Sequence, residues 1–170
     1  MREMREAGYA SDEAVRRCVS ALALTLTAPG VPMVYAGQEF GEETAKIVWR
    51  NPLHWEKLKQ PEGRAIHQSF QALGRLRRDH PALRTESVEI VSEGMPEQVG
   101  CYRRENAGRQ VTVAVNFGRT PQTVSIPVAK GRWVDILKPK RRGAGKDGLA
   151  RLDLLPGESA VVTSGPRSAQ

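Results

Sequence analysis

Residues 30–41 read GVPMVYAGQEFG, and this stretch decides the fold of the chain. Its centre, residues 31–36, is short and apolar, and polar groups follow only at its C-terminal end. That pattern is typical of a strand buried on both faces of a parallel sheet. Helical patterns precede and follow it, as in an α/β barrel or a doubly wound sheet. No other parallel strand is recognisable in the sequence, so we expect this one to belong to a larger sheet.

Two helices are predicted beside this strand. Apolar residues recur at spacings of three and four from residue 11, and a Pro-Gly pair ends the pattern before the strand. Residues 21–27, ALALTLT, alternate and taken alone could form a strand, but they continue an established helical face, which favours a helix. The second helix is predicted over residues 63–78, and His80-Pro81 ends it.

The apolar period changes to two after residue 85. Valine and isoleucine then alternate with polar residues, for example over residues 111–115 and 124–128. Turn signals rich in Gly, Asn and Pro recur at short, regular intervals between these runs. About seven short strands are predicted, which indicates an antiparallel sandwich or barrel.

The composition is that of a globular protein, with 39% hydrophobic and 26% charged residues. No apolar run approaches the roughly 20 residues that span a bilayer, and no secretory signal is recognisable, so we expect no membrane partner and a cytoplasmic location. Cys18 and Cys101 lack metal-ligand spacing and are interpreted as two buried thiols of a reducing compartment. With no phosphate-binding glycine loop and no metal motif, we expect neither a cofactor nor a metal site.

The net charge of +7 makes nucleic-acid binding an alternative to consider. The basic residues cluster at the end of the second helix and in a Gly-rich loop: Arg75, Arg77, Arg78 and Arg84, then Lys138, Lys140, Arg141, Arg142 and Lys146. Basic residues near a helix C-terminus complement its dipole. The loop cluster has no interleaved aromatic residue to stack on bases. We therefore expect no nucleic-acid partner.

The loop that follows the strand carries the candidate functional groups. Its polar residues are Gln38, Glu39, Glu42 and Glu43. They lie at the C-terminal end of a strand, where parallel α/β folds place functional residues, and two carboxylates in a cleft can act together in glycoside hydrolysis. The favoured alternative is structural: Glu39 braces the loop, while Glu42 and Glu43 face solvent. The histidines are isolated in the sequence, at His54, His67 and His80.

Residues 30–39 closely resemble the last barrel strand of the α-amylase family, glycoside hydrolase family 13. That family has Gly-x-Pro, a few apolar residues and Tyr-x-Gly, then a polar residue and Glu. Further segments resemble the family in the same order. They are Arg50-Asn51-Pro52-Leu53-His54-Trp55, residues 76–83, and residues 102–104, 113–117 and 121–124.

The resemblance implies an α+β chain made of a partial (β/α)8 barrel and an antiparallel all-β sandwich. Residues 1–85 would be the C-terminal piece of the barrel, with a helix, the eighth strand and the last helix. Residues 86–164 would be the β-sandwich, and residues 165–170 a disordered tail. In the family the catalytic carboxylates lie at the ends of the fourth, fifth and seventh strands, so the resemblance assigns no catalytic residue to this chain.

The function implied is that of a C-terminal fragment of a glycosidase or transglycosylase acting on α-glucans or α-glucosides, inactive by itself. Support of the substrate cleft is carried over to Tyr35, Gln38 and Glu39, and to Arg50, Pro52 and Trp55 in the following loop. An α-glucan or oligosaccharide would bind only in the full barrel, and the missing N-terminal part of the enzyme would be a partner. The alternative is a non-catalytic module that binds carbohydrate or a protein. We expect Tyr102 and Phe117 within strands, which disfavours an open aromatic platform.

Overall fold

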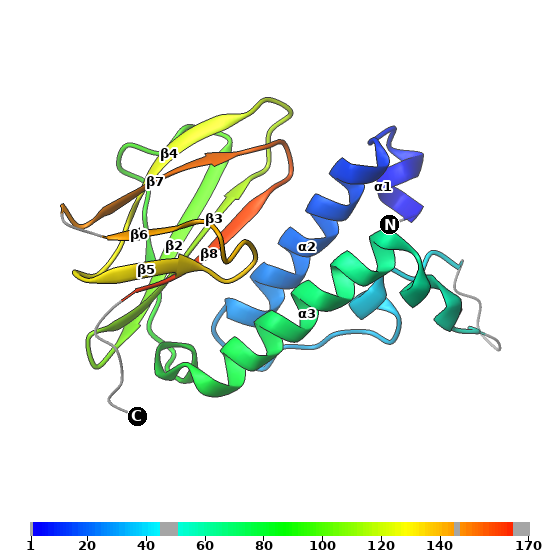
Figure 1. The fold of residues 1–170 in the computed structure, drawn as a ribbon, viewed down its shortest axis with the longest axis horizontal. Helices are drawn as coiled ribbons and strands as arrows, with labels where there is room; N and C mark the ends of the chain where they lie inside the picture. The colour runs from blue at the N-terminus through cyan, green and yellow to red at the C-terminus, as the bar shows by residue number, and fades with distance from the viewer. Residues whose placement is uncertain (1, 45–50, 145–146, 165–170) are drawn as a thin grey trace.

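A computed structural model describes residues 2–44, 51–144 and 147–164. The helices lie on one side of the molecule and the strands on the other (Figure 1). The helical elements are α1 (Arg2–Glu6), α2 (Ser11–Thr27), α3 (Pro61–Asp79) and the 3-10 turns η1 (Gln38–Phe40), η2 (Trp55–Lys59) and η3 (Pro81–Arg84). The strands are β1 (Glu89–Ile90), β2 (Val99–Asn106), β3 (Arg109–Asn116), β4 (Gln122–Pro127), β5 (Arg132–Asp135), β6 (Arg142–Ala144), β7 (Leu149–Leu154) and β8 (Ser159–Ser164).

The long helices α2 and α3 confirm the two helices predicted from the apolar period. Residues 21–27 are helical and form the last turns of α2, because their apolar side chains continue its buried face. In Figure 1 α2 lies next to the sheet and α3 lies beside α2, and side chains of both helices share a core with the sheet. Pro61 opens α3, where its missing N–H is not needed, and Pro81 follows its end.

The strands confirm the predicted mixture of helices and an antiparallel sandwich. Six of them form one sheet in the order β1-β2-β3-β8-β5-β6, and β4 pairs with β7 in a second sheet. Within the first sheet, β3 is paired on both edges: Val113 lies opposite Tyr102 of β2 and Val161 of β8. This central strand is buried almost throughout.

The two faces of the large sheet enter two different cores. Val111, Val113 and Val115 point to the helices and join a cluster with Leu22 and Leu73. The intervening positions of the sheet face the β4–β7 pair and form the second cluster. This follows from the side-chain period of two in a strand. The large sheet is therefore a middle layer, and the helices share a core with it. The predicted boundary between residues 85 and 86 remains a prediction.

Residues 31–36 do not form the doubly buried strand that their sequence predicts. Residues 31–35 form neither helix nor strand, residue 36 begins a turn, and the stretch belongs to neither sheet. Val31, Met33 and Tyr35 expose 97%, 81% and 51% of their surface, whereas Val34 packs against the helical core. The expectation of burial on both faces is wrong for the chain as described, because one face rests on the helices and no neighbouring strand covers the other. We refer to residues 31–36 as the extended segment.

Both cysteines are free thiols, Cys101 buried and Cys18 half-buried. None of the helices in the described ranges is long and apolar enough to cross a membrane. The predicted tail, residues 165–170, lies outside the described residues, as does Arg50.

Candidate functional site

The loop after the extended segment turns at two glycines. Gly37 and Gly41 flank η1 with φ angles of 95° and 74°, in the left-handed region that favours glycine. A Cβ atom on Gly37 would also lie 2.5 Å from the Cβ of Glu42. Glycine is therefore required at the first of these positions, both by backbone conformation and by the closeness of the returning chain.

Gln38 and Glu39 turn back onto their own loop. The Oε1 atom of Gln38 accepts a hydrogen bond from the N–H of Tyr35 at 2.8 Å, and the Oε2 atom of Glu39 accepts one from the N–H of Gly37 at 2.7 Å. Glu39 thus braces the loop, which is the structural role expected for it. The Tyr35 side chain is half-exposed at the end of the extended segment.

Glu42 is the most strongly held carboxylate of this loop. It accepts hydrogen bonds from the N–H of Glu43 at 2.7 Å, the N–H and hydroxyl of Thr44 at 2.9 and 2.8 Å, and the N–H of His54 at 2.7 Å. Burial raises the pKa of Glu42, but these hydrogen bonds outweigh burial and lower the pKa to about 2. The expectation that Glu42 faces solvent is wrong: its side chain is almost fully buried and ties residues 42–44 to residue 54.

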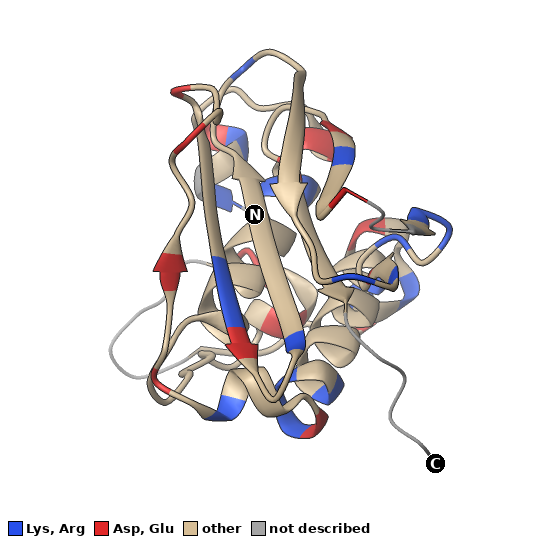
Figure 2. Cartoon of the chain, turned by 90° about the vertical axis from the view of Figure 1, so that its left-hand side faces the viewer, with Lys and Arg blue, Asp and Glu red and all other residues tan. Residues whose placement is uncertain are grey.

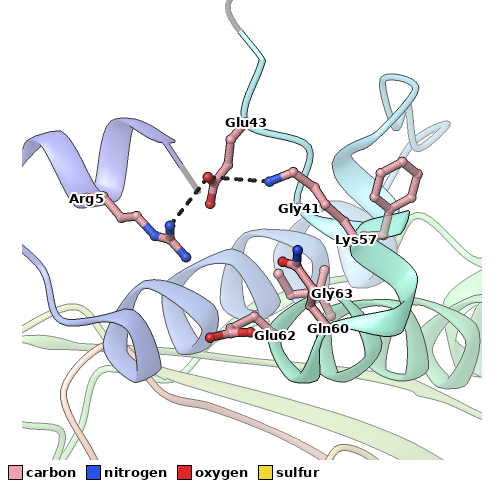
Figure 3. A pocket seen from close by; sticks show the side chains of 9 residues that line it. Arg5, Gly41, Glu43, Lys57, Gln60, Glu62 and Gly63 are labelled. Carbon is pink, nitrogen blue, oxygen red and sulfur yellow. Dashed lines mark hydrogen bonds and ion pairs between the residues drawn. The ribbon is translucent and has the colours of Figure 1, made fainter. Parts of the chain in front are cut away.

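Glu43 is also engaged. One of its oxygens lies 3.5 Å from Nη1 of Arg5 and 3.4 Å from Nζ of Lys57, so this carboxylate joins α1 to η2 (Figure 3). The expectation that Glu43 simply faces solvent is therefore wrong as well, because both contacts hold its carboxylate. The pocket between these side chains and Gly63 holds about 10 Å³, room for about one water molecule and far less than a sugar ring needs.

His54 and Trp55 meet the loop from its far end. The Nδ1 atom of His54 lies 2.9 Å from the Thr44 hydroxyl and 3.3 Å from a Glu42 oxygen, so this histidine is not isolated in space. The Trp55 ring lies 5.2 Å from the buried Phe40 ring and stays exposed on its other side. Arg50, predicted to support the cleft, lies outside the described residues.

The structure thus places Tyr35, Gln38 and Glu39 on one loop, which Trp55 contacts through Phe40. It also joins Glu42, which was expected to face solvent, to His54, which was expected to be isolated. No periodic or motif signal connects these two residues, because they are twelve positions apart and meet through a loop. An ionised carboxylate held by four donors is suited to fixing backbone, not to donating a proton. In the part of the chain that is described, no group of three or more His, Cys, Asp or Glu side chains could hold a metal ion.

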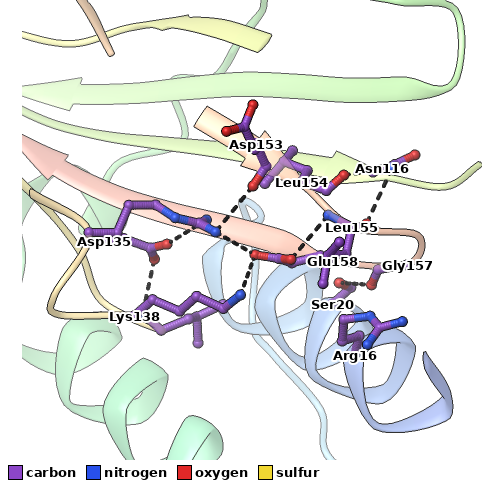
Figure 4. Close-up of polar contacts among 12 residues, drawn as sticks. Arg16, Ser20, Asn116, Asp135, Lys138, Asp153, Leu154, Leu155, Gly157 and Glu158 are labelled. Carbon is purple, nitrogen blue, oxygen red and sulfur yellow. Dashed lines mark hydrogen bonds and ion pairs between the residues drawn. The ribbon is translucent and has the colours of Figure 1, made fainter. Parts of the chain in front are cut away.

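A second polar cluster lies where β5 ends and the chain turns from β7 into β8 (Figure 4). Arg141 contacts Asp135 at 3.2 Å and Glu158 at 2.7 Å, and Lys138 contacts Glu158 at 2.7 Å. Burial raises the pKa of Asp135. Burial also raises the pKa of Glu158, but hydrogen bonds from Lys138 and Arg141 outweigh it and lower the pKa. These contacts tie β5 to the β7–β8 turn, which is a structural role.

Several basic residues of the described chain pair with carboxylates. In Figure 2 acidic residues lie among the basic ones at both ends of the view, and Glu89 of the edge strand β1 pairs with Arg103 of β2 at 2.7 Å. Two members of the predicted basic loop cluster, Lys138 and Arg141, bond to carboxylates as described above. Lys146 of that cluster lies outside the described residues.

Comparisons with known proteins agree with this architecture. A family model described as "Domain of unknown function (DUF3459)" matches residues 98–162. Alpha-amylase MalA of Haloarcula japonica is 32% identical over 85% of this chain and 21% of its own length. The 1,4-alpha-glucan branching enzyme GlgB of Pseudomonas fluorescens is 30% identical over 64% of this chain and 16% of its own length. The crystal structure of an AmyP variant in complex with maltotriose has a TM-score of 0.70, with 18% identity, over 89% of this chain and 35% of that one.

The fold and these relatives define the class as proteins related to an α-amylase and to glucan branching enzymes. More particularly, the chain is homologous to the C-terminal portion of proteins of the α-amylase family, glycoside hydrolase family 13. It spans about a fifth of the length of MalA. The likeness to AmyP shows the fold alone.

Proposed function

We propose that this chain supplies the end of the catalytic barrel and the C-terminal β-sandwich of an enzyme that acts on α-glucans or α-glucosides. By itself the chain would be inactive. The observation that carries this proposal is the extended segment between α2 and α3, whose alternate side chains Val31, Met33 and Tyr35 are exposed. An apolar extended segment with one covered and one open face is what a barrel strand becomes without its neighbouring strands.

The residues of this chain would act on the substrate by shaping the mouth of the barrel. Tyr35 lies at the end of the extended segment and Gln38 in the η1 turn that follows, and the exposed ring of Trp55 offers an apolar face on which a sugar ring can stack. Glu39 and Glu42 would hold this loop in place through the bonds described above. Arg50 is proposed to belong to the same mouth from the resemblance alone. The two carboxylates of a retaining mechanism would come from the rest of the barrel.

The test uses both the chain alone and a fusion. MalA lacking the region aligned with this chain should be inactive, and fusing this chain in its place should restore turnover of maltooligosaccharides. The chain alone should release no reducing ends from maltooligosaccharides or glycogen. Turnover by the pure chain, or a folded fusion that binds maltooligosaccharide but never turns it over, contradicts the proposal.

A non-catalytic carbohydrate-binding module is the second candidate, and Phe117 is the observation that favours it. Phe117 lies just after β3, not within it as expected, and is exposed beside a mainly apolar cavity of about 270 Å³. The neighbouring Tyr9 ring is covered by the guanidinium groups of Arg17 and Arg119, 4.2 and 4.9 Å from its centroid. Titration calorimetry with maltotriose and the Phe117→Ala variant tests this candidate, and absence of heat removes it.

A further inference from the structure

The end of α2 is held by a buried arginine from the sheet. Arg104 of β2 is 1% exposed, and its Nη1 donates to the carbonyl oxygens of Thr27 at 2.9 Å and Ala28 at 3.2 Å. Its other nitrogens donate to the carbonyl oxygens of Thr85 and Ser87. One guanidinium therefore ties the helix end to the chain that leads from η3 into the sheet.

A second arginine reaches the same place from α3. Nη1 of Arg77 donates to the Ala28 carbonyl at 2.7 Å, and Nη2 donates to the Gly30 carbonyl. The Ala28 carbonyl thus accepts from both arginines. From Pro29 to Val34, the bond from Arg77 to Gly30 is the one hydrogen bond that links this stretch to another described residue.

Neither guanidinium forms an ion pair with a carboxylate of the described chain, so the carbonyl groups provide the electrostatic partner. The last carbonyls of a helix have no partner within the helix and carry its partial negative charge. A guanidinium presents several donors in a fixed planar fork and can bond two carbonyls at once, which an ammonium cannot do with the same geometry. Arginine at both positions is therefore suited to fixing the direction of the chain that leaves α2.

We propose that Arg77 and Arg104 are positioning residues that set the direction in which the chain leaves α2 and thereby place the extended segment and Tyr35. The functional part of this inference rests on the proposed function, because only there does Tyr35 lie at a substrate cleft. The sheet and the last helix would then control the barrel mouth through backbone carbonyls. Arg77 and Arg104 touch no candidate substrate site and act through the segment.

The first test needs only the chain itself. Arg77 is half-exposed, so Arg77→Lys and Arg77→Met should fold, and Arg78→Lys on the exposed side of α3 is the matched control. Backbone ¹⁵N relaxation should show order parameters of residues 30–35 falling from about 0.8 to below about 0.6 in both Arg77 variants. The order parameters of α3 and β3 should be unchanged, as should all values in Arg78→Lys. Unchanged order parameters in both folded Arg77 variants overturn the proposal.

The second test uses the fusion with MalA. Arg77→Lys should raise the KM for maltooligosaccharide about tenfold at an unchanged melting temperature, because a displaced segment misplaces the cleft. Arg78→Lys should leave KM as it is. An active fusion whose KM does not respond to Arg77→Lys overturns the functional part. If the parent fusion itself is inactive, the proposed function fails, while the relaxation measurement on the chain still decides the positioning role.

Discussion

The extended segment and strand β3 carry the same kind of sequence and end in opposite environments. Val111, Val113 and Val115 alternate along β3 and are fully buried, while Val31 and Met33 alternate along the extended segment and lie in water. β3 has a hydrogen-bonded strand on each edge and helices over one face. An alternating apolar sequence thus favours a strand, but paired neighbours decide whether a strand forms.

The largest expected contrast is in stability. Leu73 of α3 is fully buried in the core that the helices share with β3, so Leu73→Ala should lower the free energy of unfolding by about 2–5 kcal/mol. Met33→Ala should change it by less than about 0.5 kcal/mol, because that side chain is exposed. Urea denaturation followed by far-UV circular dichroism measures both. A cost for Met33→Ala near that of Leu73→Ala would show that the Met33 side chain is buried.

Low pH should destabilise the folded chain through the buried His80. Burial, and then the charge of Arg109, lower the pKa of this histidine to about 4. The neutral ring is therefore favoured in the folded state. The buried neutral ring contributes its full stability above the unfolded pKa of about 6.5. About 3 kcal/mol of the free energy of unfolding is lost as the pH falls from 6.5 to 4.

The matched variant for this effect is His80→Asn. Asparagine does not titrate, and its side-chain oxygen can accept the hydrogen bond that the N–H of Ala82 donates to His80. Unfolding free energies of the two proteins, measured between pH 7 and pH 4, should diverge as the pH falls. Parallel pH dependence of the two proteins would show that His80 is not buried in its neutral form.

A smaller effect is expected at the glycines that bound the extended segment. Gly30 and Gly37 have nearly equal φ angles of 94° and 95°, but only a Cβ on Gly37 would meet another atom. Gly30→Ala should cost about 1 kcal/mol for backbone strain, and Gly37→Ala about 2 kcal/mol more for the clash with Glu42. Equal costs in thermal unfolding would show that the loop relaxes freely away from Glu42.

The sequence predicts those features that repeat along a single element. The helical period identifies α2 and α3, including the ambiguous residues 21–27, and the period of two identifies the sandwich strands. The features that the sequence does not predict depend on contacts with residues far along the chain. Neighbouring strands decide the burial of residues 31–36, and the contact of Glu42 with His54 crosses a loop that has no period to read.

The candidate site is predicted to a similar extent. Gln38 and Glu39 were recognisable from their place after an apolar run, and their bonds to the local backbone fit the structural role expected of Glu39. In the sequence Arg77 is recognisable only as a member of a basic cluster, and Arg104 only as a residue of a segment that resembles a strand. Their targets are backbone carbonyls, which carry no sequence signal.

Amide hydrogen exchange at Val31, Met33 and Val34, measured in the chain alone and in the active fusion with MalA, distinguishes an isolated segment from a paired barrel strand. In the chain alone these amides should exchange at nearly the unprotected rate, because they pair with no described strand. In the fusion they should slow by about a hundredfold or more, as amides of a barrel strand paired on both edges. Protection already present in the chain alone, or its absence in an active fusion, would contradict the account.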